Sequence, residues 1–401
     1  MRVLLSAYAC EPNRGSESET GWQRALHMLA HADEVWVITR ANNKLVIESH
    51  PLSQTAELHF IYYDLPRWAV RLKKKFWFPR LYFALWQWGA YRMAAKFHHE
   101  KPFDCVYHAT FAGILSGSFM GRLGIPFIIG PIGGGERAPF RLRRSMSIRS
   151  QLSELLRDFG ILLQRYSPLT LSAFAAAERI YVTTPETMRL VLPRWHKKTS
   201  VQLSFGICRE TSPHYERELF DTPRFVFVGR LIHWKGAHFA IRALAEARKK
   251  VPAATLTLFT GGPDEQWLRN IANQAGVVDA VEFAGHVPSR QQLMDSLSNY
   301  TALVFPSLHD SGGMVVLEAL SKGLPAVCLD LGGPGVIVNE SCGIVIPTFR
   351  AKEEEIVTRI ANAMISLAIM SAKESARLSI GAVTRANELS WVSLTERIAR
   401  A

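Results

Sequence analysis

Two carboxylates flank a pair of glycines in the stretch SLHDSGGMVVLEALSKGLP. Asp310 stands just before Ser-Gly-Gly, and Glu318 follows eight residues later. Glycines let the backbone approach a ligand closely, and a helix that begins near Gly313 would direct free N–H groups and the positive end of its dipole at a phosphate. Glu318 would lie about one and a half turns into that helix, where it could accept hydrogen bonds from ribose hydroxyls. The alternative is that Asp310 or Ser311 merely caps the helix and that Glu318 is solvated.

Two cations follow another strand-like run in the stretch RFVFVGRLIHWKG. The run ends at Gly229, and Arg230 and Lys235 come before a helical pattern. A guanidinium fork and an ammonium point charge near the end of a strand suit a diphosphate, although isolated surface cations are common. In VEFAGHV, a strand that ends before His286 and Val287 could present its backbone to a nucleobase. This third signal is weak by itself.

Two glycine-rich segments follow strand-like runs in the first half of the chain, CEPNRGSESETGW (residues 10–22) and GPIGGGE (residues 130–136). Neither has the GxGxxG spacing of a dinucleotide site, and no GxxxxGK[ST] loop is present. This argues against a nicotinamide dehydrogenase. His108 ends the run FDCVYH, so we expect it at the same sheet edge as these glycines, in either a structural or a functional role.

The elements that must position these residues alternate between strand-like and helix-like segments. The strand-like runs are RVLLSAY, EVWVITR, LHFIYY, FDCVYH, PFIIG and RIYVTT in the first half, and RFVFVG, TLTLFT, VEFAG, TALVFP, PAVCLD and GIVIP in the second. Many are continuously apolar, as parallel strands covered on both faces are. The pattern predicts two doubly wound α/β domains, with a break within residues 205–223 and a mostly helical end over residues 352–401.

Length and composition agree with two domains. The chain has 401 residues, of which 48% are hydrophobic and 20% charged. The five cysteines are far apart and form no CxxC or Cys/His cluster, which argues against a disulfide framework and a zinc site and fits a reducing cytosol. No apolar run is long enough to span a bilayer as a simple helix, and the run in MRVLLSAYAC is too short for a signal peptide.

The positive charge is confined to one region. The formal net charge is +12, and residues 67–157 carry 16 basic and 4 acidic side chains. Such a region is a candidate for contact with a membrane surface, a phosphorylated acceptor or nucleic acid. Residues 67–101 and 137–149 mix cations with aromatic or apolar side chains, as interfacial segments on anionic lipid do. The alternative is a helix packed on the core with Trp86 and Trp88 buried. No nucleic-acid-binding motif accompanies the charge.

Taken together, these segments resemble the family-4 (group 1) retaining glycosyltransferases. Asp310-x7-Glu318 is similar to the E-x7-E signature of that family, with Asp in place of the first Glu. GRLIHWKG resembles its diphosphate-binding segment, VEFAGHV its strand before the base site, and GSESETGW its first glycine loop. GPIGGGE and SLHDSGG-x3-LEA resemble one bacterial subgroup, and SW-x3-TERI resembles the closing helix. Judged by these motifs, the resemblance extends from residue 1 to about residue 335.

The resemblance implies the GT-B fold, in which two Rossmann-like domains face each other across a cleft. Residues 1–205, with a C-terminal helix at 388–401 crossing back, would bind the acceptor. Residues 220–387 would bind the nucleotide sugar. The reaction would move a hexosyl group, with retention of configuration, to a glycan or lipid-linked acceptor in cell-surface polysaccharide or lipopolysaccharide synthesis.

The resemblance also implies roles for individual residues. Arg230 and Lys235 would stabilise the leaving diphosphate in place of a metal ion, so that neither a metal nor a cofactor is expected. Asp310 would contact the donor sugar, with a reach shortened by one methylene, and His108 would lie near the reacting sugar. The remaining residues expected to bind the donor are Gly229, His286, Val287, Gly312, Gly313, Met314, Val315 and Glu318. Those expected to form an acceptor or phosphate loop are Gly15, Ser16, Gly133, Gly134 and Glu136.

These implications place the protein in the cytoplasm, peripherally on the cytosolic face of the inner membrane, through residues 67–149. Nucleic acid is not expected as a partner. A nucleotide-sugar epimerase or hydrolase on the same scaffold is the alternative within this fold, because architecture does not fix the reaction. A basic nucleic-acid-binding protein is the alternative from a different class.

Overall fold

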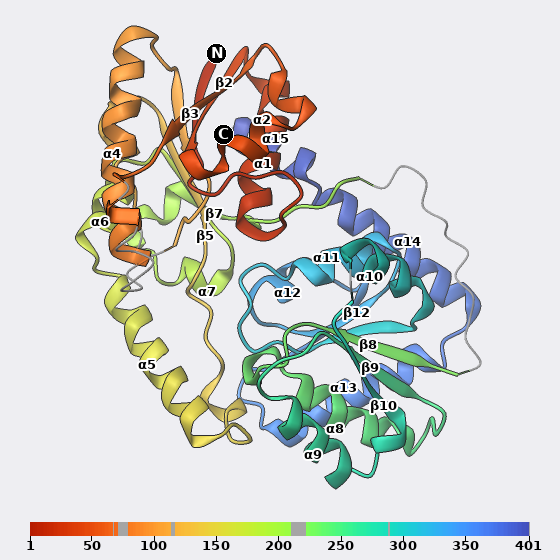
Figure 1. Cartoon of the computed structure of the whole chain (residues 1–401). Helices are drawn as coiled ribbons and strands as arrows, with labels where there is room; N and C mark the ends of the chain where they lie inside the picture. The colour runs from red at the N-terminus through yellow and green to blue at the C-terminus, as the bar shows by residue number, and fades with distance from the viewer. Residues whose placement is uncertain (67, 71–78, 114–116, 210–221, 288, 401) are drawn as a thin grey trace. The chain divides into compact units, whose positions relative to one another are not determined.

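The computed structural model describes residues 1–400 apart from 67, 71–78, 114–116, 210–221 and 288 (Figure 1). The chain forms two compact units. The first unit comprises residues 1–135, 159–206 and 391–401, and the second comprises residues 136–158 and 207–390. Most of the predicted linker, residues 205–223, lies outside the described residues.

The first unit is built on a seven-stranded parallel sheet with the order β3-β2-β1-β4-β5-β6-β7. The order reverses beside β1, as in a doubly wound sheet. The strands are β1 (Arg2–Ser6), β2 (Glu34–Arg40), β3 (Leu58–Tyr63), β4 (Cys105–His108), β5 (Phe127–Ile132), β6 (Arg179–Val182) and β7 (Thr199–Val201).

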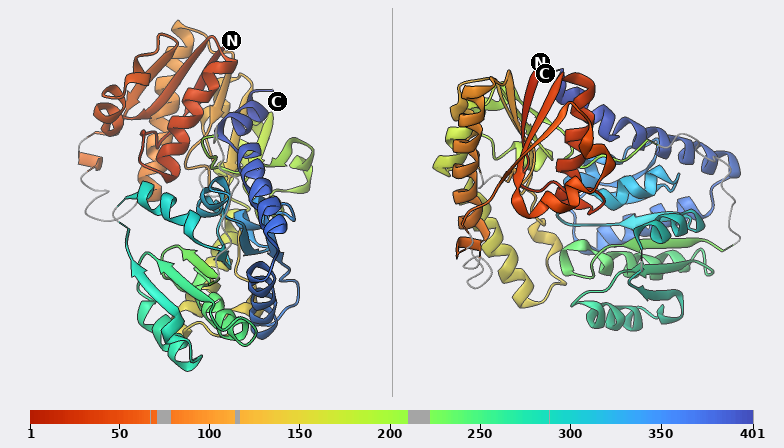
Figure 2. Two further views of the ribbon diagram at one scale, coloured as in Figure 1. Left: turned by 90° about the vertical axis from the view of Figure 1, so that its right-hand side faces the viewer. Right: turned by 45° about the horizontal axis from the view of Figure 1, so that its top comes forward.

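Successive side chains of a strand point to opposite faces of this sheet, so both faces are apolar. In β1, Val3 and Leu5 join the buried cluster under α1 (Ser16–Met28) and α15 (Trp391–Ala399). Leu4 joins the cluster under α4 (Pro79–Glu100) and α6 (Pro168–Ala176). Figures 1 and 2 show α1 and α4 on opposite faces. The helices are α1 (Ser16–Met28), α2 (Lys44–Glu48), α4 (Pro79–Glu100), α6 (Pro168–Ala176), α7 (Pro185–Met188) and α15 (Trp391–Ala399).

The last helix, α15, packs on α1. Nη1 of the buried Arg24 donates a hydrogen bond to Oγ1 of Thr395 at 3.1 Å, and the Arg24 guanidinium lies 5.5 Å from the centre of the Trp391 ring. The resemblance predicts such a return of the last helix to the first domain, and residues 391–401 group with the first unit.

Helix α4 occupies much of the basic and aromatic region 67–101. Trp86 is fully buried in the core of the first unit, and its Nε1 donates to the carbonyl oxygen of Tyr63 at 2.8 Å. Trp88 is 40% exposed. The helix therefore packs one face, with Trp86, in the core and leaves Trp88, Leu81 and Leu85 exposed. Residues 67 and 71–78 of this region lie outside the described residues.

The second unit contains a six-stranded parallel sheet with the order β10-β9-β8-β11-β12-β13. Its strands are β8 (Arg224–Val228), β9 (Thr255–Phe259), β10 (Val281–Gly285), β11 (Ala302–Phe305), β12 (Ala326–Leu329) and β13 (Gly343–Ile346). Its helices are α8 (Ala237–Arg248), α9 (Glu265–Gln274), α10 (Arg290–Ser296), α11 (Met314–Ser321), α12 (Gly332–Ile337), α13 (Glu353–Ala368) and α14 (Ala372–Glu388). Helix α5 (Ile148–Gln164) begins in this unit and ends in the first.

The strand order of the second unit reverses between β8 and β11. Ligands of doubly wound sheets bind at such a reversal, outside the carboxyl ends of the strands. The loops after β8 and β11, which carry the predicted diphosphate-binding residues, are therefore neighbours. Two doubly wound parallel units confirm the predicted α/β fold class.

Within the described residues, no single helix combines the length and apolar character needed to cross a membrane. Helices α13 and α14, joined at a bend of 112°, meet the length and composition requirement only as a pair.

Candidate functional site

The loops after β8 and β11 are packed together at Gly236. This residue has a φ of 78°, and a Cβ placed on it would lie 2.0 Å from the carbonyl oxygen of Pro306. Only glycine fits there, because both the backbone conformation and the space exclude a side chain. The N–H of Leu308 also donates to the carbonyl oxygen of Trp234 at 2.8 Å. These contacts fix the position of Lys235, which lies between Trp234 and Gly236.

Lys235 and Asp310 form an ion pair across these two loops. Nζ of Lys235 lies 2.5 Å from Oδ2 of Asp310. Oδ1 of the same carboxylate accepts hydrogen bonds from the N–H groups of Gly312 at 3.1 Å and Gly313 at 3.2 Å. Burial acts to raise the pKa of Asp310, but Lys235 and the two N–H groups outweigh burial and lower it. Asp310 therefore holds the lysine and the glycine turn in place as an ionised carboxylate.

Helix α11 begins at Met314, which confirms the predicted helix start near Gly313. Gly313 has a φ of 62°, and a Cβ on it would lie 3.0 Å from the backbone nitrogen of Pro334. Among the described residues, the N–H groups of Met314 and Val315 have no hydrogen-bond acceptor. Arg230 is exposed on the loop after β8 and forms no ion pair with another described residue. Free N–H groups and cations at one sheet edge can together bind an anion.

Glu318 is buried on α11 and is paired with Arg290, the first residue of α10. Nη2 and Nε of Arg290 lie 2.5 and 2.8 Å from Oε1 of Glu318. Burial raises the pKa of Glu318, and Arg290 offsets part of this effect. His286 and Val287 lie on the loop between β10 and this arginine. Arg290 was not among the residues predicted to bind the donor, although its position at a helix start five residues after the end of β10 was a usable signal.

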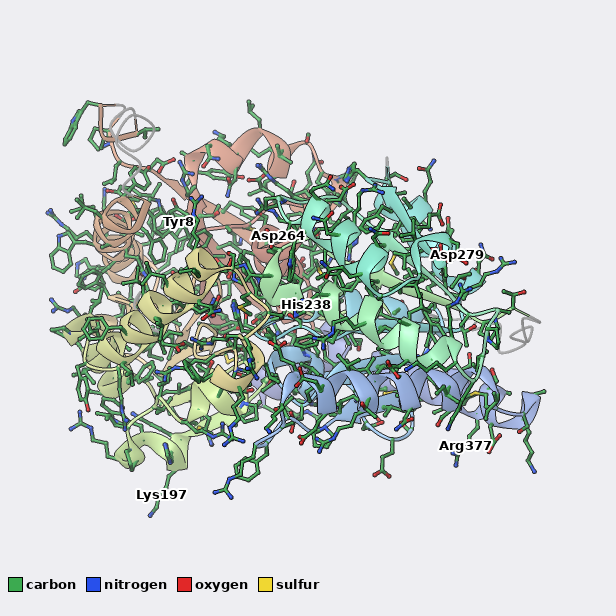
Figure 3. The ribbon with its side chains drawn as sticks, turned by 90° about the horizontal axis from the view of Figure 1, so that it is seen from below. Tyr8, Lys197, His238, Asp264, Asp279 and Arg377 are labelled. Carbon is green, nitrogen blue, oxygen red and sulfur yellow. The ribbon has the colours of Figure 1, made fainter. Side chains whose placement is uncertain are left out.

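A second residue that was not predicted, Glu154 of α5, contacts both the loop after β8 and the loop after β11. Its Oε1 lies 3.0 Å from Nε2 of His309 and 3.3 Å from Nε2 of His233. His233 also faces Asp264, whose Oδ2 is 3.9 Å from Nδ1; Asp264 is labelled in Figure 3. No spacing rule connects Glu154 with histidines so far along the chain, so the sequence contained no signal for this contact.

The first unit places His108 at the end of β4, beside Ser6 of β1. Its Nδ1 lies 3.0 Å from Oγ of Ser6, and its Nε2 has no hydrogen-bond partner among the described residues. Burial lowers the pKa of His108 to about 4, so the imidazole is neutral near pH 7.

The predicted glycine loops of the first unit follow β1 and β5. Gly15 directly precedes α1, and Ser16 is its first residue. The N–H of Gly133 donates to the carbonyl oxygen of Ala112 at 3.2 Å, and Gly134 follows it with a φ of 105°. Carboxyl ends of parallel strands meet at one edge, so these loops lie at the same edge as the end of β4.

Glu136 is buried and begins the part of the second unit that precedes α5. Its carbonyl oxygen accepts a hydrogen bond from Nη2 of Arg157 at 2.9 Å. The structure thus groups Arg230, Lys235, Asp310, Glu318 and their neighbours in the second unit, and His108 and the first glycine loops in the first. No group of three or more His, Cys, Asp or Glu side chains arranged to hold a metal occurs among the described residues.

Residues 214–373 match a family model described as glycosyl transferases group 1. A glycogen synthase of Mycobacterium tuberculosis is 37% identical over 120 residues, which cover 30% of this chain and 29% of that protein. A GDP-mannose-dependent alpha-(1-6)-phosphatidylinositol monomannoside mannosyltransferase of the same species is 28% identical over 188 residues, or 45% of this chain and 47% of that protein. The chain therefore spans less than half the length of these relatives.

The structure of the lipopolysaccharide outer core galactosyltransferase WaaB is similar to the whole chain. Its TM-score is 0.62 at 13% identity, and the similarity covers 99% of this chain and 98% of the other. At this identity the likeness establishes the fold, which is that of GT-B glycosyltransferases. The residues that match the family model, 214–373, belong to the unit that carries Lys235, Asp310 and Glu318.

Proposed function

We propose that the protein is a glycosyltransferase that uses a nucleotide-diphosphate sugar as donor. The ion pair between Lys235 and Asp310 at the start of α11 is the observation that carries this proposal. It sets a cation and two free helix N–H groups at the strand reversal where a ligand of this fold binds. A diphosphate gains negative charge as the sugar departs, and fixed donors that already point at that charge lower the barrier.

The residues of the second unit then divide the donor between them. Lys235, Arg230 and the N–H groups at the start of α11 stabilise the leaving diphosphate. Glu318 binds the ribose hydroxyls, and the ion pair with Arg290 acts against the rise in the pKa of Glu318 that burial causes. Asp310 orients Lys235 and contacts the donor sugar. Because two side-chain cations supply the charge, we expect the reaction to need no metal ion or cofactor.

We further propose that the sugar is a hexose and that its configuration is retained, with the leaving phosphate taking the proton of the acceptor. Glycan or lipid-linked acceptors for cell-surface polysaccharide or lipopolysaccharide synthesis bind at the first unit, near His108 and the loops at Gly15, Ser16, Gly133 and Gly134. Glu136, the residue that begins the second unit, follows the last of these loops in the sequence. The names of the similar mannosyltransferase and galactosyltransferase support this class of acceptor. An enzyme that acts on such acceptors is expected to be a cytoplasmic protein, and residues within 67–149 would hold it at the inner membrane.

Calorimetry with UDP, GDP, ADP, dTDP, CDP and NADH tests the donor site, because binding of the product diphosphate needs no acceptor. We expect one nucleoside diphosphate to bind and Lys235→Ala to weaken it roughly tenfold or more, since a charge-assisted hydrogen bond is lost. Lys249→Ala is the matched control, because Lys249 is an exposed lysine at the end of α8. Binding of no diphosphate, or equal binding by both variants, contradicts the donor site.

Product analysis separates transfer from the alternatives on the same scaffold. Epimerisation or hydrolysis of the isolated nucleotide sugar would favour an epimerase or hydrolase, provided that no sugar is transferred to any glycan or lipid acceptor. With an acceptor in hand, NMR of the first-formed linkage shows whether the anomeric configuration is retained.

A further inference from the structure

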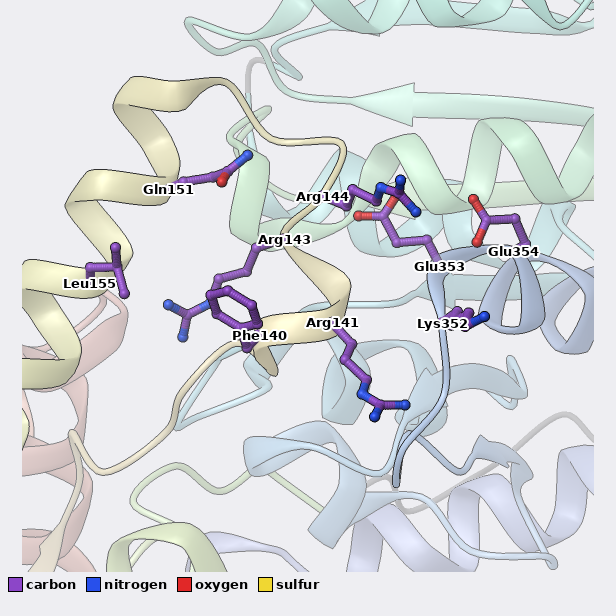
Figure 4. A pocket seen from close by; sticks show the side chains of 9 residues that line it. All are labelled: Phe140, Arg141, Arg143, Arg144, Gln151, Leu155, Lys352, Glu353 and Glu354. Atoms are coloured by element: carbon purple, nitrogen blue, oxygen red, sulfur yellow. The ribbon is translucent and has the colours of Figure 1, made fainter.

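The second unit contains a basic pocket of 470 Å³ that shares no lining residue with the candidate donor site (Figure 4). It lies between the stretch from residue 140 to the first turns of α5 and the residues at the start of α13. Figure 4 shows Phe140 and Arg143 on the side of Leu155, and Arg144 and Lys352 on the side of α13. The pocket therefore has one wall with apolar groups and one wall that is mainly charged.

The acidic side chains of the basic pocket already have a cationic partner. Oε2 of Glu353 lies 3.5 Å from Nη1 of Arg242, and its Oε1 accepts the N–H of Ser145 at 2.8 Å. Glu354 lies 3.8 Å from Nη2 of the same arginine. Because Arg242 does not line the pocket, both acids direct their charge toward a neighbour outside it.

Three cations of the basic pocket have no such partner. Arg141, Arg144 and Lys352 form no ion pair with any residue of the described part of the chain. Arg141 donates one hydrogen bond, to the carbonyl oxygen of Arg350 at 2.9 Å. The pocket therefore has an unbalanced positive charge, which favours an anionic ligand.

Arg143 adds a buried donor to this pocket. It is 4% exposed, and its Nη2 lies 2.7 Å from Oδ2 of Asp158. Its Nη1 is buried and has no hydrogen-bond partner among the described residues. Buried donors are nearly always satisfied, so a free guanidinium nitrogen in a basic pocket points to a missing acceptor. Arginine forks fit phosphate oxygens well.

The apolar side chains around the pocket indicate what kind of molecule contains the phosphate group that binds there. Phe140 is 78% exposed and Leu155 is 49% exposed. Ile148, Leu152 and Leu156 are also exposed on α5. Their spacing along the helix places them with Leu155 on one face. An exposed apolar face beside cations is typical of a helix that lies in the surface of an anionic bilayer.

We propose that the basic pocket binds the phosphate group of an anionic membrane lipid, with Phe140 and the exposed apolar side chains of α5 entering the acyl boundary. A soluble phosphate would use the cations and leave the apolar face without a partner. The inference rests on the membrane association proposed above, and the donor site can be correct without it.

Sedimentation with vesicles tests the pocket with the full chain. The vesicles contain phosphatidylcholine alone or phosphatidylcholine with phosphatidylglycerol. We expect binding only with phosphatidylglycerol, and a loss of about tenfold or more in Arg144→Gln through one charge-assisted contact. The matched control is Arg149→Gln, an exposed arginine of α5 that does not line the pocket. It should lose about fivefold or less, as one cation near a charged surface does.

Two further measurements identify the source of the phosphate. Phe140→Ala should weaken vesicle binding and leave the affinity for inorganic phosphate, measured by calorimetry, unchanged. Tight inorganic phosphate binding with no preference for vesicles, or equal losses in Arg144→Gln and Arg149→Gln, overturns the proposal. Nucleoside diphosphate binding measured on the same variants should be unchanged, so a failure of this inference is distinct from a failure of the donor site.

Discussion

The carboxylate of Glu154 lies 3.0 Å from Nε2 of His309, the residue that immediately precedes Asp310. The same oxygen lies 3.3 Å from Nε2 of His233, two residues before Lys235. Burial acts to raise the pKa of Glu154, but hydrogen bonds from the two histidines outweigh it and leave the pKa below its ordinary value. One ionised side chain from α5 therefore joins the two loops that carry the candidate donor residues.

We expect Glu154→Gln to lower the affinity for the nucleoside diphosphate several-fold, although Glu154 is not expected to touch it. The neutral amide of glutamine accepts weaker hydrogen bonds from the two histidines than the carboxylate does. The free energy of unfolding should therefore also fall by about 1–3 kcal/mol. Its contribution should be present above the ordinary pKa of a glutamate and should be lost as the pH falls through the lower pKa of the folded state. Calorimetry and denaturant unfolding measure the two effects.

Glu265→Gln is the control for Glu154→Gln, since Glu265 forms an exposed pair with Arg269 one turn along α9. Surface pairs of this kind contribute little. A Glu154→Gln protein with unchanged stability and diphosphate affinity would show that α5 does not position the loops.

Elements with a local signal could be predicted from the sequence. Continuous apolar runs identified the strands that form the centres of both sheets, and the glycines at 312 and 313 marked the start of α11. Strand β7 was missed because its three residues, Thr199–Val201, are mostly exposed and carry no apolar pattern. Trp86 and Trp88 differ in burial although only one residue separates them, because the helix turns them toward different surroundings.

Partners chosen by tertiary packing could not be predicted. Asp310 was expected to contact a sugar, and its observed partners are Lys235 and the glycine turn, with the capping role among the stated alternatives. The partner of Glu318 is Arg290, which lies in a different helix. Such contacts depend on which loops the strand order brings together, and no short motif records that order.

Gly236→Ala should reduce stability and diphosphate binding by more than the positive φ at this position alone would cause. An alanine at a φ of 78° costs about 1–2 kcal/mol, and its Cβ would also overlap the carbonyl oxygen of Pro306. Backbone displacement should move Lys235, so diphosphate binding should be lost along with stability. Gly276→Ala separates the two causes, because Gly276 has a φ of 67° and nothing lies within 4 Å of its added Cβ. Equal losses of stability in the two variants would contradict the packing described at Gly236.

His108 should make the stability of the first unit depend on pH. The folded protein keeps this imidazole neutral with a pKa of about 4, whereas the unfolded chain takes up a proton near the ordinary value of 6.5. The free energy of unfolding should therefore be highest above pH 6.5, fall as the pH decreases, and level off below pH 4, with a total change of about 3 kcal/mol. Denaturant unfolding across this range measures the slope.

Replacement of His108 by glutamine should reduce that slope, whereas His99→Gln, at an exposed position near the end of α4, should leave it unchanged. The buried His238 of the second unit, labelled in Figure 3, has a pKa lowered by burial to about 3 and should retain its own contribution in both variants. A His108→Gln protein with the full slope would mean that His108 is accessible to protons in the folded state.

Glu318→Gln should remove discrimination between ribose and deoxyribose. If the buried carboxylate accepts hydrogen bonds from both ribose hydroxyls, the wild-type protein should bind its nucleoside diphosphate roughly tenfold more tightly than the 2′-deoxy analogue. Glutamine can accept only a weaker, neutral hydrogen bond, so the variant should bind both compounds about equally. Glu340→Gln, an exposed position in the same unit, should keep the wild-type preference. Calorimetry with the pair of nucleotides gives the ratio directly, and a Glu318→Gln protein that still prefers the ribonucleotide would show that the ribose binds elsewhere.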